Sequence, residues 1–163
     1  MSGVRVGHGF DAHRLAAGRP FVLGGVLIPF ERGPLGHSDG DALAHALADA
    51  ILGACALGDL GRHFPDTDPH WKDADSLELL ATCAELAREA GYAIGNVDAT
   101  VVVEAPKLAP HLPAIRERLA ETLRIDLALV SVKAKTSEGM GYTGDGTGIA
   151  AYAVVILERS NRS

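Results

Sequence analysis

Two histidines and one carboxylate near the start of the chain have the types and the spacing of metal ligands. Asp11 and His13 are two positions apart, so in an extended strand both side chains point to the same side. His45 lies one helical turn after Asp41, inside an otherwise apolar segment, and could supply a third ligand. Such a set leaves a coordination position open, as in catalytic zinc sites. The alternative is a solvated Asp11–His13 loop and a hydrogen-bonded core histidine.

Two further segments carry groups that could bind charged ligands. HSDGD, residues 37–41, has Ser38 and Asp41 at the spacing of a helix cap, and it leaves His37 beside free N–H groups where an anion could bind. KAKTSE, residues 133–138, ends a predicted strand with two lysines, two hydroxyls and a carboxylate, which can bind phosphate and magnesium. A plain helix cap and a solvated strand end are the alternatives.

Two loops give less specific signals. FPDTD, residues 64–68, is typical of a proline-led turn, in which aspartates are more often solvated than ligating. GMGYTG, residues 139–144, has the glycine spacing of a dinucleotide-binding loop. That loop must open a helix, whereas residues 149–157 are predicted to form a strand, so we exclude this function.

Apolar periodicity predicts the elements that must position these groups. Strands are expected at residues 4–12, 97–104, 130–137 and 149–157, with a short hairpin within 21–29. Helices are expected from Ser38 to about Gly58, from Asp75 to Gly91, and from an opening turn that contains Pro110 and Pro113. This order predicts an α/β fold of the two-layer α+β kind, with helices on one face of a mixed sheet, and one domain over residues 1–163.

Composition excludes several classes of protein. The 163 residues are 47% hydrophobic and 22% charged, which excludes a disordered chain. A net charge of -6 and 5% aromatic residues argue against a nucleic-acid partner. No apolar segment predicts a membrane span or a secretion signal. Cys55 and Cys83 fall at apolar positions of predicted helices, so we expect reduced thiols and a cytoplasmic protein.

Several motifs together resemble one enzyme family. They are GHGFDAH at 7–13, HSDGD at 37–41, ALGDLG at 56–61, FPDTD at 64–68, GNVDAT at 95–100, APK at 105–107 and the GYTG loop. In this order, and over essentially the whole chain, they resemble the 2-C-methyl-D-erythritol 2,4-cyclodiphosphate synthases of the non-mevalonate isoprenoid pathway.

The resemblance implies a homotrimer with its active sites between neighbouring subunits. Asp11, His13 and His45 match the residues that hold zinc or another divalent transition metal. Glu138 matches a ligand of magnesium or manganese. The partners implied are therefore a small cytidine diphosphate substrate, two kinds of metal ion and further copies of the chain.

The resemblance also implies which residues contact the substrate. In one subunit these are Asp11, His13, His37, Ser38, Asp59, Leu60, Gly61, Phe64, Pro65, Asp66, Thr67 and Asp68. The stretches 103–109 and 134–136 of the adjoining subunit would hold the cytosine and the nucleotide phosphates. The other implied contacts are Val103, Ala105, Pro106, Lys107, Leu108, Ala109, Ala134, Lys135, Thr136, Ser137, Glu138 and Tyr142.

The implied reaction is an intramolecular phosphoryl transfer. In 4-diphosphocytidyl-2-C-methyl-D-erythritol 2-phosphate, the 2-phosphate oxygen attacks the β-phosphorus of the diphosphate and CMP leaves. The attacking oxygen already carries negative charge near neutral pH, so no strong general base is required. His37 and Thr136 match the catalytic residues that orient the substrate and stabilise the transition state.

The last loop departs from the family pattern, and two other functions compete with this one. Asp145 and Thr147 stand where many family members have an arginine and a glutamate that line a cavity on the trimer axis. A non-haem iron oxygenase also uses two histidines and a carboxylate, although usually in the order His-x-Asp followed by His. A trimeric cytidine-nucleotide-binding module without turnover is the second alternative.

Overall fold

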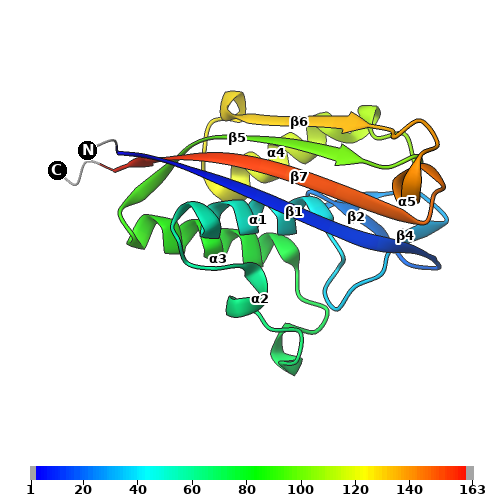
Figure 1. Ribbon diagram of the computed structural model, residues 1–163, viewed down its shortest axis with the longest axis horizontal. Helices are drawn as coiled ribbons and strands as arrows, with labels where there is room; N and C mark the ends of the chain where they lie inside the picture. The colour runs from blue at the N-terminus through cyan, green and yellow to red at the C-terminus, as the bar shows by residue number, and fades with distance from the viewer. Residues whose placement is uncertain (1–2, 161–163) are drawn as a thin grey trace.

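A computed structural model describes residues 3–160, and in this part of the chain five strands form one curled, mixed sheet in the order β4-β1-β7-β5-β6 (Figure 1). The strands are β1 (Val4–Ala17), β4 (Arg32–Pro34), β5 (Tyr92–Val102), β6 (Val130–Lys135) and β7 (Gly148–Arg159). A separate hairpin consists of β2 (Phe21–Leu23) and β3 (Val26–Ile28). Only β5 and β6 pair in parallel within this sheet, which brings their carboxyl ends to the same edge.

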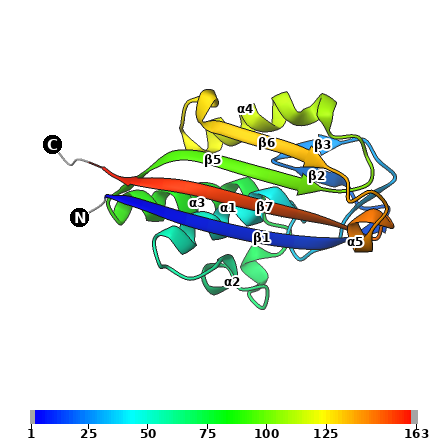
Figure 2. The same cartoon turned by 45° about the horizontal axis from the view of Figure 1, so that its top comes forward.

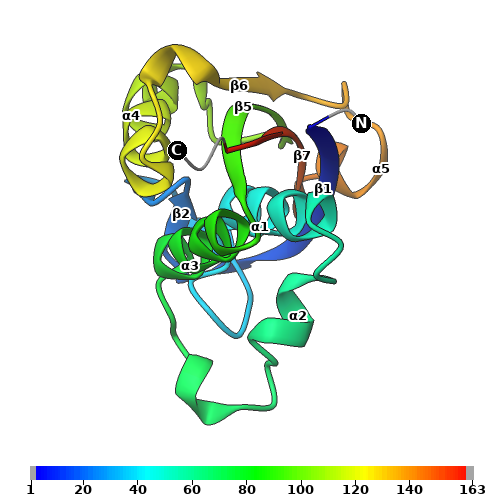
Figure 3. The ribbon, with the colours of Figure 1, turned by 90° about the vertical axis from the view of Figure 1, so that its left-hand side faces the viewer.

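The longer helices lie on one side of the sheet (Figure 3). They are α1 (Ala42–Ala54), α3 (Ser76–Glu89) and α4 (Leu112–Leu123). Shorter turns of helix lie in the connections: α2 (Leu60–His63), α5 (Gly141–Gly144), η1 (Pro69–Trp71), η2 (Ala109–His111) and η3 (Leu127–Leu129). No helix in the described part of the chain is both long enough and apolar enough to cross a membrane.

Side chains alternate across the sheet, as expected for strands with one buried face. On β1, Asp11 and His13 face the helices, whereas Val6 and Phe10 face away from them and are 64% and 46% exposed. Phe10 pairs with Tyr152 of β7, and their ring centroids are 5.1 Å apart. The long strands run in front of α1 and α3 in Figure 2. The sheet therefore has a buried face toward the helices and an exposed apolar face over β1 and β7.

Most predicted elements are present, with shifted ends. The first strand continues to Ala17, because residues 15–17 pair with β4. The helix predicted from Ser38 to Gly58 occupies only Ala42–Ala54. Ser38 is not its N-cap, because the Ser38 hydroxyl lies 3.1 Å from His45 Nε2 instead of at the helix start.

The other predicted helices, the last loop and the cysteines agree more closely with expectation. Helix α3 begins after Asp75, while Pro110 lies in η2 and Pro113 in the first turn of α4. The loop before β7 contains only the short helix α5, so a strand follows the glycine motif as predicted. Both cysteines are free thiols, although Cys55 lies at the C-cap of α1 and not within the helix. Burial raises the pKa of Cys83 to about 12.

Asp41, not Ser38, is the N-cap of α1 and also joins this helix to the β2–β3 hairpin. The carboxylate accepts hydrogen bonds from Gly24 N–H at 2.9 Å, Gly25 N–H at 2.7 Å and Ala44 N–H at 3.0 Å. Asp41 is fully buried. Burial raises its pKa to about 6, while these backbone donors lower it. One side chain thus satisfies three main-chain donors from two separate elements.

We expect Asp41→Ala to lower the free energy of unfolding by about 3 kcal/mol, since it leaves buried N–H groups without an acceptor. Asp75→Ala is the matched control, because Asp75 is an exposed N-cap that accepts from Leu77 N–H. It should cost only about 1 kcal/mol. Urea unfolding of both variants measures the difference. Equal losses would show that the buried bonds of Asp41 contribute no more than an ordinary cap.

Candidate metal centre and active site

The two elements that carry the candidate metal ligands are in direct backbone contact. A Cβ atom at Gly7 would lie 1.8 Å from the carbonyl oxygen of Ala50, and one at Gly9 would lie 1.8 Å from that of Ala46. Only glycine allows α1 to approach β1 this closely, and the alanines on the facing side of α1 leave room for the strand. This contact brings His45 of α1 beside the side chains of Asp11 and His13, which β1 directs toward the helices.

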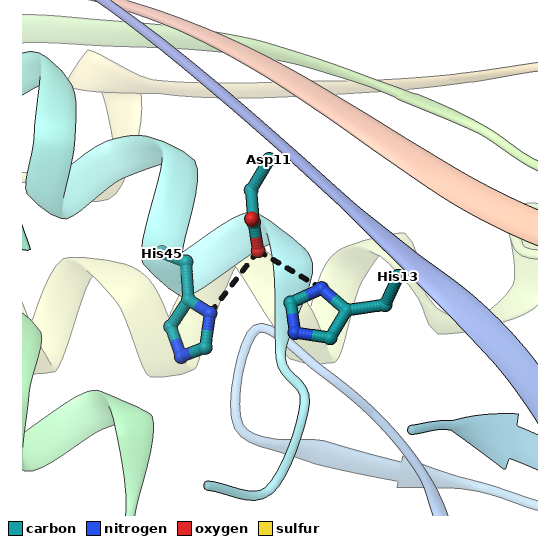
Figure 4. Close-up of side chains that lie close together, drawn as sticks. All are labelled: Asp11, His13 and His45. Carbon is teal, nitrogen blue, oxygen red and sulfur yellow. Dashed lines mark hydrogen bonds and ion pairs between the residues drawn. The ribbon is translucent and has the colours of Figure 1, made fainter. Parts of the chain in front are cut away.

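These three side chains form a compact cluster (Figure 4). Asp11 Oδ2 is 3.0 Å from His13 Nδ1 and 3.1 Å from His45 Nδ1. Each residue offers one potential ligand atom, a carboxylate oxygen or an imidazole nitrogen, and these three atoms lie within 4.8 Å of one another. His13 Nδ1 is buried, and within the described chain it makes no hydrogen bond of acceptable geometry, even with Asp11. A buried imidazole nitrogen without a proton partner, beside a carboxylate and a second imidazole, suits a divalent metal ion.

The charges of the cluster shift the pKa values of its members. Burial raises the pKa of Asp11, but the close imidazole groups of His13 and His45 outweigh it and hold the pKa below the ordinary value of an aspartate. Burial lowers the pKa of His45, but the hydrogen bond and charge of Asp11, with the charges of Asp41 and Asp39, raise it above the ordinary value of a histidine. The cluster therefore keeps an ionised carboxylate, which is the form that binds a metal ion.

The cluster lies in the wall of a cavity of about 540 Å³. The cavity is lined by Asp11, His13, His37, Ser38, His45, Asp49, Leu60, Gly61, Phe64, Pro65, Asp66, Thr67, Trp71 and Leu79. Most substrate residues implied for one subunit thus meet the metal cluster in one place. Asp59 and Asp68 do not line it. They instead cap short helices, where Asp59 accepts from Arg62 N–H and Asp68 from His70 N–H.

Sequence reasoning missed three lining residues. Asp49 lies one helical turn after His45 on α1, and this spacing was the available signal. It accepts a hydrogen bond of 2.7 Å from Leu60 N–H, and its pKa is raised by burial and by the charges of Asp59 and Asp11. Trp71 packs edge-to-face on Phe64 with ring centroids 4.8 Å apart. Leu79 of α3 is buried, and an apolar side chain at such a position gives no signal of a site.

A second cavity, of about 170 Å³, lies where the parallel strands β5 and β6 end. It is lined by Val103, Glu104, Pro106, Lys107, Leu108, Ala109, Ala134, Lys135 and Thr136. Among the described residues, the two cavities share no lining residue. The implied metal side and the implied nucleotide side of the site are therefore separate in one chain.

The remaining implied contacts lie outside both cavities. The Ser137 hydroxyl is 2.6 Å from that of Thr143, and Glu138 is exposed in a left-handed conformation (φ 52°). Tyr142 lines a further cavity of about 290 Å³, which also includes His13. Ala105 lies in the connection that follows β5. Tyr142 therefore shares a cavity with one member of the metal cluster.

Comparisons with known proteins agree over nearly the full chain. The chain is 57% identical to the 2-C-methyl-D-erythritol 2,4-cyclodiphosphate synthase of Halalkalibacterium halodurans, over 94% of this chain and 98% of that protein. A solved structure of such a synthase in a CDP-bound form matches with a TM-score of 0.88 and 41% identity, over 94% of this chain and 100% of that one.

A bifunctional protein and a family model extend the comparison. The bifunctional IspDF from Campylobacter jejuni matches with a TM-score of 0.93 and 42% identity. The match covers 96% of this chain and 42% of that longer chain. A sequence model described as the YgbB family matches residues 4–158. The chain therefore belongs to the YgbB family, and it shares its fold with solved structures of 2-C-methyl-D-erythritol 2,4-cyclodiphosphate synthases.

Proposed function

We propose that this protein is a cyclodiphosphate synthase. It would convert 4-diphosphocytidyl-2-C-methyl-D-erythritol 2-phosphate into 2-C-methyl-D-erythritol 2,4-cyclodiphosphate with release of CMP. The observation that carries the proposal is the cluster of Asp11, His13 and His45 in the wall of a substrate-sized cavity. Curated relatives with this name support it, whereas nothing in the comparisons favours the oxygenase or the binding module without turnover.

The charge of the first cavity supports a metal-dependent reaction. Its lining includes Asp11, Asp49 and Asp66, and among the described residues it includes no lysine or arginine. A phosphate group in this cavity would meet negative charge unless a metal ion were present. Zinc bound by the histidine–aspartate cluster, with Mg²⁺ or Mn²⁺ on Glu138, would withdraw charge from the diphosphate as Lewis acids.

The chain's own residues would align the reacting groups. In the second cavity, Lys135 would provide positive charge for the nucleotide phosphates, and Lys107 would contact the cytosine. His37 and Ser38, in the first cavity, would hold the methylerythritol 2-phosphate near the β-phosphorus, and Thr136 would support the transferred group from the other side. Because the nucleophile and the leaving group belong to one substrate, catalysis depends mainly on this alignment.

A homotrimer would bring the two halves of the site together. Within one chain the metal cluster and the strand-end cavity are separate, so a complete site requires the second cavity of a neighbouring copy. The exposed apolar face over β1 and β7 offers a surface for such assembly. The free thiols Cys55 and Cys83 suit a reducing compartment, and we place the enzyme in the cytoplasm.

Incubation with the authentic substrate tests the proposed reaction. Phosphorus NMR should show the cyclic diphosphate appearing together with an equal amount of CMP. Removal of metal by a chelator should stop the reaction, and added Zn²⁺ with Mg²⁺ should restore it. Substrate that remains unchanged with metal-loaded protein, while cytidine nucleotides still bind, would instead support the binding module.

The departure at Asp145 leads to a prediction about the trimer axis. Asp145 is exposed, and its pKa is lowered by its hydrogen bonds with Thr147. If symmetry gathers copies of this carboxylate around an axial cavity, they should repel a diphosphate. We expect no detectable calorimetric binding of farnesyl diphosphate, and a gain of binding in Asp145→Arg. Tight binding by the unmodified protein would contradict this prediction.

A further inference from the structure

His45 has two ring nitrogens, and the structure turns them toward different groups. Nδ1 faces Asp11 Oδ2 at 3.1 Å, on the side of the metal cluster. Nε2 faces away from it, 2.8 Å from the hydroxyl of Ser76 and 3.1 Å from that of Ser38. Ser76 is 1% exposed and is the first residue of α3. The ring is thus held between the metal cluster and a buried hydroxyl from another helix.

The Ser76 hydroxyl donates its proton to the carboxylate of Asp39, on the side of Ser76 away from His45. Ser76 Oγ donates to Asp39 Oδ1, and Ser76 N–H donates to Asp39 Oδ2 at 3.0 Å. Asp39 Oδ1 also accepts from Asp41 N–H at 3.1 Å. Because an ionised carboxylate cannot donate, the Ser76 proton must point to Asp39. Toward His45 the hydroxyl oxygen can then act only as an acceptor, so the 2.8 Å contact is a hydrogen bond when Nε2 carries a proton.

We propose that Ser76 and Asp39 are positioning residues that fix the tautomer of His45, so that Nδ1 presents its lone pair to the metal. This inference rests on the proposed metal function of the cluster. A ligand histidine commonly donates its other ring N–H to a carboxylate or another acceptor, which fixes the ring and increases its basicity. Here the carboxylate acts through an intervening serine. This role accounts for Asp39, a residue of HSDGD that does not cap helix α1.

The Ser76 hydroxyl is not needed to begin helix α3. Asp75 is already the N-cap of this helix and accepts from Leu77 N–H at 2.9 Å. The bond from Ser76 N–H to Asp39 uses the main chain and survives replacement of the side chain. Removal of the hydroxyl should therefore affect His45 more than the fold. Thr82 provides a matched control, because its exposed hydroxyl on the same helix donates to Glu78 C=O, away from His45.

The first test compares zinc affinity by competition with a chromophoric chelator. We expect Ser76→Ala to bind zinc about 10- to 100-fold more weakly than the unmodified protein, and Thr82→Ala to bind it normally. Thermal unfolding of the metal-free proteins should be similar. Zinc affinity of Ser76→Ala within twofold of the unmodified protein would overturn the inference. His45→Ala separates the two proposals: retention of tight zinc binding there would refute the metal site itself.

The second test needs no variant, so a folding defect in Ser76→Ala cannot obscure the answer. Nitrogen NMR of the zinc-loaded, histidine-labelled protein should show His45 bound to metal through Nδ1, with a slowly exchanging proton on Nε2. A metal-bound Nε2 and a protonated Nδ1 in the unmodified protein would overturn the inference, whatever the affinities are.

Discussion

Replacement of His45 by alanine should abolish turnover while the chain remains folded. Loss of one ligand from the cluster removes both metal affinity and several kcal/mol of Lewis-acid stabilisation, so we expect kcat to fall by about a thousandfold or more. The fold should tolerate the change, because α1 is already rich in alanine and alanine favours helix. CMP release and the zinc content of the purified variant measure both effects.

His111→Ala is the matched control for this experiment. His111 precedes α4 and makes no side-chain capping hydrogen bond, and it lies outside both cavities. The variant should keep its zinc and its activity. If His45→Ala instead retained near-normal turnover and full zinc content, the assignment of the metal ligands would be wrong.

The fold was predictable where local signals and burial agree. Helix α3 was predicted from an acidic start, an apolar face and a terminal glycine, and it occupies Ser76–Glu89. The limits of α1 were not predictable in the same way, because two residues of HSDGD can serve as caps. Asp41 is the cap, since its carboxylate also meets the N–H groups of Gly24 and Gly25, distant in sequence. A pattern read along the chain contains no information about that contact.

The candidate site, too, was predictable only where its residues lie close together in the sequence. Strand alternation was enough to predict that Asp11 and His13 share a face. The approach of His45 depends on the backbone contact at Gly7 and Gly9, whose role is visible only once α1 lies against β1. Ser76 gave no signal at all. Its position as the first residue of α3 looks like part of a helix start, and its contact with His45 joins elements 31 residues apart.

Two inactive variants should restore activity to each other if each site is shared between chains. His45→Ala removes a ligand from the metal half, and Glu138→Ala removes the proposed magnesium ligand from the half that a neighbour would supply. In trimers mixed randomly from equal amounts of both chains, a site works only if each half is unmodified. The metal half is unmodified in about half of the sites, and the neighbour's half is unmodified in about half of those. About one site in four should therefore be active.

A second mixture provides the control for this rescue. His45→Ala combined with His13→Ala places both defects in the metal half, so every site in the mixed trimers keeps one defect and activity should stay at background. Subunit exchange is verified in both mixtures by mass spectrometry of chains that carry different labels. About a quarter of normal CMP release in the first mixture and none in the second requires that the metal cluster of one chain works with the strand-end residues of another. No activity in either mixture after verified exchange would place the whole site within a single chain, and the separation of the two cavities in the monomer would then need a rearrangement of the chain itself.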